Sequence, residues 1–176
     1  MYNEIESSKG GNSGKPQENI SINELEILKK QEEQFQFEHF TNEDIWKLGK
    51  WMTEEAMRQA LPIAISIRLF SGVIAFQYFC KGSKLNNETW MKRKELTVRE
   101  MEMSSLRMCM EFEAAGKTME DKLMDRYTYA CCGGGFPIRI RNAGVIGSII
   151  VSGLPHKDDH AFIIHCLEGF FRSENL

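Results

Sequence analysis

The chain has 176 residues, of which 42% are hydrophobic, and it carries a net charge of −3 at neutral pH. This is enough for one well-filled core. The eight acidic and four basic residues up to Glu38 give −4, whereas the 17 acidic and 18 basic residues that follow give +1. A nearly neutral body argues against non-specific nucleic-acid binding, which needs a strongly basic surface. No apolar run reaches the roughly 20 residues that span a bilayer, and no export signal is recognisable.

The cysteines favour a reduced, cytoplasmic protein. There are five of them, an odd number, and no CxxC motif occurs; this pattern is unlike a disulfide framework. The adjacent Cys131 and Cys132 could be redox-active or bind a soft metal. We favour the simpler interpretation that they are small buried residues leading into a strand.

The first part of the chain predicts an extension, a helix and a hairpin. Residues 1–19 are rich in Ser, Gly, Asn, Lys and Glu, and we expect them to be disordered or ordered by a partner. Residues 22–34 have the spacing of a short amphipathic helix, and residues 35–40 that of a short strand or extended link. Thr41 or Asn42 should cap a helix that ends before Leu61-Pro62. Two alternating stretches, residues 61–69 and 73–80, then predict an antiparallel hairpin.

The middle of the chain predicts two further helices. Asn86 or Asn87 should cap a helix that runs to about Met103, and its charged run, residues 92–94, is typical of a solvated face. Ser104-Ser105 looks like a break and a new cap, and Gly116 is suited to end the helix that follows. Residues 118–125 should form one more short turn.

The C-terminal part predicts a second hairpin and a last helix. Residues 136–141 alternate between apolar and polar side chains, as in a strand with one buried face. Residues 145–151 are apolar on both faces, which favours a central strand covered on both sides. Ser152 to Pro155 form an elbow, and a helix with an apolar stripe beginning at His160 follows. Paired strands with long helical inserts indicate an α+β fold, and we expect the elbow to open beside a cavity.

Three segments carry a resemblance to a known family: LPIAISIR, NNETWMKRKELTV and GGGFPIRI…GVIGSIIVSGLPHKDDH. They resemble the haem-degrading-domain family that includes GlcG and HbpS, and above all its short branch of unknown function. The resemblance extends from about Phe37 to Phe171. It implies a profilin-like or PAS-like antiparallel sheet of about five strands, flanked by helices. We therefore divide the chain into an N-terminal extension, residues 1–36, and an α+β domain, residues 37–176.

The same resemblance implies partners and ligands. Members of the family form homodimers that can assemble into larger rings. Relatives have been linked to haem binding or degradation, to cobalamin-linked modules and, in one yeast relative, to an adaptor-like role. Haem is therefore the cofactor to test.

Two groups of side chains could bind such a ligand. His160 is either a buried histidine bonded to a backbone carbonyl, which we favour, or a ligand of iron; His156 and His165 are expected to be exposed. Arg68, Arg139 and Arg141 could converge on a carboxylate or phosphate. The alternative is an exposed sheet face, or an interface, on which each arginine pairs with a glutamate.

Glycines and the elbow give further candidates. Gly133 to Gly135 could let a ligand approach the backbone, although a sharp bend before a strand is the simpler interpretation. The amides that follow Ser152 could hold an anion at the start of the last helix. Trp90 and Lys94 share a helix face and could wall a pocket, unless Trp90 belongs to the core.

We find no catalytic set of residues, because no GxSxG, HExxH or paired-carboxylate motif is present. The leading hypothesis is a cytoplasmic, homo-oligomeric protein that binds a small ligand between the sheet and the last helix, with haem or another anionic compound as the candidate. The alternatives are an oxidoreductase that degrades haem and a ligand-free scaffold that uses the extension. The candidate ligand-binding residues are Arg68, Trp90, Lys94, Gly134, Phe136, Ser152 and His160.

Overall fold

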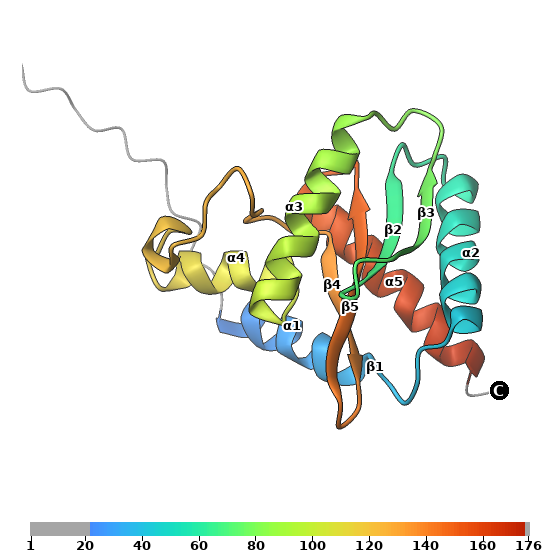
Figure 1. Cartoon of the computed structure of the whole chain (residues 1–176), viewed down its shortest axis with the longest axis horizontal. Coiled ribbons are helices and arrows are strands. Elements are labelled where there is room, and N and C mark those ends of the chain that lie inside the picture. The colour runs from blue at the N-terminus through green and yellow to red at the C-terminus, as the bar shows by residue number, and fades with distance from the viewer. Residues whose placement is uncertain (1–21, 175–176) are drawn as a thin grey trace, which may run out of the picture.

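The computed structural model describes residues 22–174, which form helices around one five-stranded sheet (Figure 1). The predicted disorder of residues 1–19 lies outside the described residues. The helices are α1 (Ile22–Gln34), α2 (Asn42–Arg58), α3 (Asn86–Met101), α4 (Ser105–Ala114), the short 3₁₀ helix η1 (Glu120–Lys122) and α5 (His156–Glu174). The strands are β1 (Gln36–Phe37), β2 (Ala64–Leu69), β3 (Ile74–Phe79), β4 (Gly135–Ile140) and β5 (Gly144–Ser152).

The sheet has the order β1-β4-β5-β2-β3, so β5 is its middle strand. The predicted α+β fold and central strand are confirmed. Four strands pair antiparallel, as two hairpins joined through β5 and β2. The expectation of a purely antiparallel sheet needs one correction, because β1 runs parallel to β4. β1 follows directly from α1 and not from a hairpin, so no tight turn dictates its direction.

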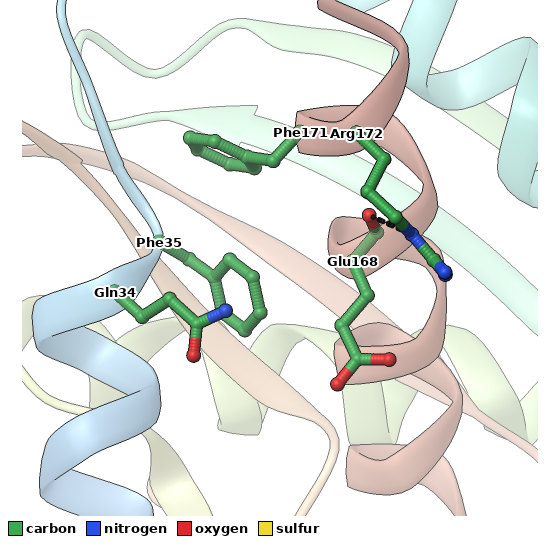
Figure 2. A pocket seen from close by; sticks show the side chains of 5 residues that line it. All are labelled: Gln34, Phe35, Glu168, Phe171 and Arg172. Atoms are coloured by element: carbon green, nitrogen blue, oxygen red, sulfur yellow. Dashed lines mark hydrogen bonds between the residues drawn. The ribbon is translucent and has the colours of Figure 1, made fainter. Parts of the chain in front are cut away.

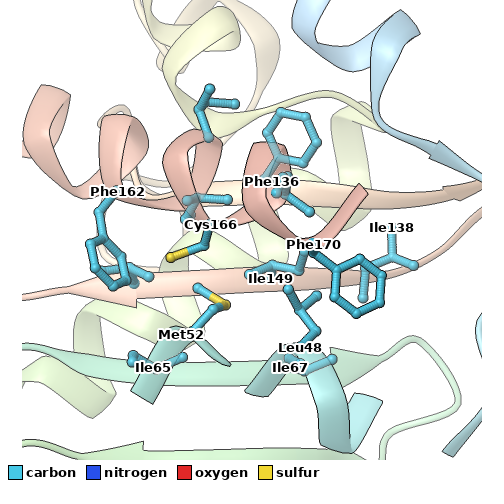
Figure 3. Close-up of a cluster of buried hydrophobic side chains, with 14 of the residues drawn as sticks. Leu48, Met52, Ile65, Ile67, Phe136, Ile138, Ile149, Phe162, Cys166 and Phe170 are labelled. Carbon is cyan, nitrogen blue, oxygen red and sulfur yellow. The ribbon is translucent and has the colours of Figure 1, made fainter. Parts of the chain in front are cut away.

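One face of the sheet carries the main core (Figure 3). Leu48 and Met52 of α2, and Phe162 and Cys166 of α5, pack against isoleucines and Phe136 of the strands. Phe136 is fully buried there, on the face that its strand turns toward α5. Burial of each large side chain contributes about 1.5–3 kcal/mol, so this face supplies most of the apolar stabilisation.

The other face of the sheet is covered by α3 (Figure 1), and its contacts are partly charged. Met91 packs on Ala64 and Ile150. Beside them, Arg68 of β2 is only 2% exposed. It donates to Glu88 at 2.7 Å and to Glu95 at 3.0 Å, both on α3. α3 is therefore held on the sheet by ion pairs as well as by apolar contacts.

The helix starts agree with expectation except at α3. Thr41 caps α2, and its hydroxyl accepts from the amide of Asp44 in a capping box. Ser104 caps α4 by accepting from the amide of Arg107. The cap predicted for α3 is wrong, because Leu85 occupies the N-cap position without a side-chain bond. Asn87 instead uses its carbonyl oxygen to accept from the amide of Lys84, at 2.6 Å.

The predicted helix of residues 22–34 is confirmed as α1, and it packs on α4. Leu28 is buried with Leu106 and Met110. Glu32, 6% exposed, accepts from the backbone amide of Ser104 and from the guanidinium of Arg107, each at 2.8 Å. A buried carboxylate with two donors gives this contact a specific geometry as well as apolar area.

Glu32→Ala tests this contact between α1 and α4. The substitution leaves a buried amide and part of a guanidinium without an acceptor, so we expect the free energy of unfolding to fall by about 1–3 kcal/mol. Urea denaturation followed by circular dichroism measures the change. The control is Glu33→Ala, because Glu33 is the exposed neighbour on the same helix. Equal losses in the two variants would contradict the structural role of Glu32.

Candidate functional site

The elbow after β5 lines a pocket of about 290 Å³, which also borders α3 and the start of α5. We call it the elbow pocket. Its lining residues are Asn86, Asn87, Trp90, Lys94, Cys132, Ser152, Gly153, Leu154, His156 and Asp159. The expectation that the elbow opens beside a cavity is thereby confirmed.

A buried ion pair forms the inner wall of the elbow pocket. The ammonium of Lys94 donates to Asp159 Oδ2 and to the carbonyl oxygen of Val151, each at 2.8 Å. Both side chains are 3% exposed. The expectation that residues 92–94 form a solvated face is therefore wrong at Lys94. Lys94 lies one helical turn beyond Trp90 and faces the sheet, whereas Lys92 is exposed.

Asp159 also occupies the start of α5. Its second oxygen accepts from the amide of Leu154 at 3.0 Å. Burial raises the pKa of Asp159, while the Lys94 ammonium and the amides of Leu154 and Gly153 lower it. These amides are the ones that the sequence offers to an anion. The chain's own carboxylate fills that position, so a ligand does not find it free.

Gly134 provides the space that the ion pair needs. Its φ of +104° favours glycine, and a Cβ atom there would lie 2.5 Å from Lys94 Nζ and from the carbonyl oxygen of Val151. The sequence predicts that a ligand could approach the backbone at this glycine. The group found close to it is instead the Lys94 ammonium. The neighbouring Gly133 amide donates to His156 Nδ1 at 3.2 Å.

The outer wall of the elbow pocket is aromatic. Trp90 is 40% exposed, with the guanidinium of Arg93 stacked 4.2 Å from its ring centroid, so the alternative that places it in the core is wrong. Asn87 donates to the carbonyl oxygen of Ser152 at 3.0 Å. His156 is exposed, as expected. Because its Nδ1 accepts a bond, the proton of the neutral ring is assigned to Nε2, which is left as a donor.

Four of the seven candidate residues do not line the elbow pocket: Gly134 only borders it, next to Lys94 and Asp159, and the other three lie away from it. Phe136 belongs to the core, and Arg68 is enclosed by Glu88 and Glu95. Of the two alternatives for the arginines, convergence is not observed, and pairing with glutamates is found for Arg68 and Arg141. Arg139 donates to the carbonyl oxygen of Glu102, at 2.6 Å, and Arg141 pairs with Glu38, also at 2.6 Å. Each of these guanidinium groups already has an acceptor within the chain.

His160, the third of them, is buried beside Phe136. Its Nε2 lies 3.0 Å from Gln31 Oε1, so the expected backbone carbonyl is replaced by a side chain of α1. Its Nδ1 has no partner among the described residues. Burial lowers the pKa of His160 from 6.5 to about 4, so the ring is neutral at physiological pH.

A second pocket, which the sequence analysis missed, lies between α1 and the end of α5. It has about 370 Å³, and we call it the aromatic pocket. Its lining residues are Gln34, Gln36, Phe37, Glu38, His39, Asp44, Arg141, Phe170 and Phe171. A neighbouring depression of about 440 Å³ shares Gln34 and Phe171 with it. Figure 2 shows the rings of Phe35 and Phe171 in that depression, across from Glu168 and Arg172.

His39 lies against a carboxylate at the edge of this pocket. Its ring is 72% exposed, and Nδ1 lies 3.1 Å from Asp44 Oδ2. Burial works against the charge of Asp44, but bonds from Thr41 and from His39 lower the pKa of Asp44 below its usual value. An ionised acceptor on Nδ1 places the ring proton there and leaves the lone pair on Nε2. The Thr-x-x-Asp capping box just after His39 is the one sequence signal that could have indicated this pair.

Comparison with known proteins identifies the family. Residues 40–168 match the family described as haem degrading protein HbpS-like. The chain belongs to the HbpS-like family. A UPF0303 protein from Streptomyces avermitilis is 38% identical over 81% of this chain and 88% of its own length.

Two solved structures extend the comparison. The Ybr137w protein has a TM-score of 0.79 at 29% identity, covering 86% of this chain and 90% of its own. PduOC in complex with haem has a TM-score of 0.59 at 19% identity, covering 72% of this chain and 91% of its own, and it shows the shared fold alone.

Two features of the described part of this HbpS-like chain bear on membranes and metals. None of its helices in residues 22–174 has the length and apolarity needed to cross a bilayer. Within the same residues, no three His, Cys, Asp or Glu side chains gather as a metal site.

The burial of a neutral His160 ring predicts that the stability of the fold depends on pH. The unfolded chain takes up a proton at His160 below pH 6.5, and the folded chain does so only near pH 4. Folding stability is therefore lost as the pH falls between these values, by about 2 kcal/mol between pH 7 and pH 4.5.

Urea unfolding at several pH values measures this loss. His160→Gln should remove most of it, whereas His165→Gln, at an exposed histidine of the same helix, should keep it. An identical pH dependence in the two variants would show that His160 is not the group responsible.

Proposed function

We propose that this HbpS-like protein is a cytoplasmic binding protein, and that the elbow pocket holds a small, acceptor-rich molecule with a flat apolar part. One observation carries the proposal. The pocket places the exposed ring of Trp90 next to hydrogen-bond donors whose nearby charges are already paired within the chain.

The polar groups of the elbow pocket favour acceptors on the ligand. Lys94 uses two of its three N–H groups on Val151 and Asp159, which leaves one for a ligand. His156 Nε2 is a donor, and the exposed amide of Asn86 makes no hydrogen bond within the described residues. A carboxylate or carbonyl compound would satisfy these groups. This supports the small anionic ligand expected from the sequence.

The size of the elbow pocket and its aromatic wall restrict the ligand further. Small-molecule sites usually enclose about 300–1,000 Å³, and this pocket, of about 290 Å³, lies at the lower limit. Trp90 offers a ring face to a planar group. Small aromatic carboxylates are therefore the chemical class that we expect.

Trp90→Ala tests the elbow pocket. We expect benzoate or nicotinate to bind the unmodified protein saturably, with an affinity lowered at least fivefold in the variant, because stacking contributes about 0.5–1.5 kcal/mol beyond burial. Isothermal titration calorimetry measures both. Trp46→Ala is the control, because Trp46 is an exposed tryptophan on α2 and does not line the pocket. The proposal fails if neither acid binds, or if the two variants bind alike.

Haem is the second candidate ligand, because the family is described by haem degradation and a solved relative holds haem. The elbow pocket does not suit it. The ring proton of His156 is on Nε2, and burial raises the pKa of the Cys132 thiol, whereas iron binds an unprotonated imidazole nitrogen or a thiolate.

The aromatic pocket suits haem better. His39 offers Nε2 while Asp44 holds Nδ1, an arrangement that orients histidine ligands of metals. Phe37, Phe170 and Phe171 supply apolar surface, and the half-exposed Arg141 could bind a propionate. Bound haem would supply a redox-active iron. Degradation of haem would in addition need an external reductant, and this activity stays a prediction. The alternative role as a ligand-free scaffold also stays a prediction.

Titration of the ligand-free protein with haemin tests this second candidate. We expect a saturable Soret shift that is lost in His39→Ala. It should persist in His165→Ala, which removes another exposed histidine paired with a carboxylate. A shift that survives in His39→Ala would place the haem elsewhere, and the absence of any shift would remove haem as a ligand.

We also propose that the protein is a homodimer or larger oligomer assembled through β3. This strand is an edge of the sheet (Figure 1) and exposes Ile74, Tyr78 and Phe79, next to Val73 in the turn. Native edge strands are usually short, charged or covered, and a large exposed apolar surface commonly marks an interface. A second copy that covers β3 would bury these side chains.

Ile74→Glu tests this interface, because a charge buried in it would oppose association. We expect a lower molar mass for the variant than for the unmodified protein in light scattering coupled to gel filtration. Leu123→Glu, at an exposed apolar side chain in a loop, should leave the mass unchanged. An unmodified protein that is already monomeric at micromolar concentration would contradict the proposal.

A further inference from the structure

Three of the five cysteines, Cys109, Cys131 and Cys132, gather where α4 faces the segment that enters β4. The Sγ atom of Cys109 lies 3.2 Å from the carbonyl oxygen of Cys131, to which it donates. Cys131 is exposed, which corrects the interpretation of this residue as a small buried one. The other two cysteines, Cys80 and Cys166, are buried in the main core.

The thiols of Cys109 and Cys131 influence each other directly. When the Cys109 thiol donates to the Cys131 sulfur instead of to its carbonyl oxygen, this hydrogen bond lowers the pKa of Cys131, against the effect of burial and of Glu113. The same bond, followed by burial, raises the pKa of Cys109. Cys131 is thus the thiol that ionises first, and it is also the one that solvent reaches. A lowered pKa and exposure are the two properties that make a cysteine reactive toward oxidants.

The geometry favours Cys109 over Cys132 as the partner of Cys131. Disulfides usually join residues whose Cα atoms are 4.4–6.8 Å apart, whereas adjacent residues have Cα atoms only about 3.8 Å apart. Cys131 lies in an irregular segment followed by glycines, which can adjust to the bond. Cys109 is held in α4 with its sulfur already against Cys131.

We propose that Cys131 and Cys109 are a redox-active dithiol that closes an intramolecular disulfide in the presence of a hydroperoxide. The Cys131 thiolate attacks the hydroperoxide oxygen, the O–O bond breaks, and a sulfenic acid and an alcohol (water, for hydrogen peroxide) are formed. The Cys109 sulfur then displaces the hydroxyl group as water. Two thiols lose two electrons and two protons in total, and the peroxide bond is reduced.

The dithiol lies outside the two pockets proposed to bind ligands. Neither Cys109 nor Cys131 lines the elbow pocket or the aromatic pocket. Cys132, however, lines the elbow pocket next to Cys131. The disulfide would thus constrain the segment that forms one edge of that pocket. The chemistry of the dithiol itself needs no bound ligand.

The experiment uses the full chain, reduced, freed of reductant and then treated with stoichiometric hydrogen peroxide. Of the five free thiols, two should disappear, with an intact mass lower by about 2 Da because two hydrogen atoms are lost. Tryptic peptides should carry the 109–131 bond, and a thiol reductant should reverse it.

Single variants identify the roles of the cysteines. Cys109→Ser should stop at the sulfenic acid of Cys131, which dimedone traps, and Cys131→Ser should form neither product. Cys132→Ser is the matched control for the redox step and should form the same 109–131 bond as the unmodified protein. Circular dichroism checks that each variant folds. The proposal is overturned by a 131–132 or intermolecular bond, by five thiols that persist, or by the same product in Cys131→Ser.

Discussion

The buried ammonium of Lys94 holds three elements of the structure at one point. Lys94 comes from α3, its carbonyl acceptor from β5 and its carboxylate acceptor from α5. Removal of one partner of such a pair leaves an uncompensated buried charge and costs about 3–5 kcal/mol. The position of α3 on the sheet and the start of α5 are therefore fixed together. Gly134 makes this arrangement sterically possible, because any side chain there would occupy the space of the ammonium.

The location of the elbow pocket follows from this constraint. Asp159 can reach Lys94 only if the chain turns sharply after Ser152, and the same turn brings the Leu154 amide to the carboxylate. Trp90 lies one helical turn before Lys94 and is thus placed at the mouth of the space beside the turn. The anchored side of the pocket is ionic and buried, while its open side carries the aromatic ring of Trp90.

Much of the fold could be predicted from the sequence, because apolar periodicity reports which faces of an element are buried. The apolar run of residues 145–151 predicts a central strand, and the alternation in residues 61–69 predicts its neighbour; both are observed. Burial of a charge does not follow from a local pattern. The partner of Lys94 lies 65 residues away in the chain, and the partners of Arg68 are 20 and 27 residues away.

Only part of the candidate site could be predicted, because local patterns report burial and spacing but not contacts between distant residues. Trp90, Lys94 and Ser152 line the elbow pocket, because helix spacing and the end of an apolar strand locate them. Phe136 and His160 follow the apolar stripe of their elements into the core, so the pattern that singled them out is one of burial. His39 escaped notice because its role depends on the bond to Asp44, and a lone histidine in an extended segment carries no periodic signal.

A common principle connects three cations that are buried or partly buried. Arg68, Lys94 and Arg107 each join a helix to another part of the fold through carboxylates of the same chain. Cations used in this way have little charge left to attract an anion from a distance, and screening by salt acts mainly on exposed charges. If the elbow pocket binds a ligand as we propose, recognition depends on contact, through the Trp90 ring and the remaining donors. A site of this kind selects its ligand by shape and by the position of acceptor atoms more than by net charge.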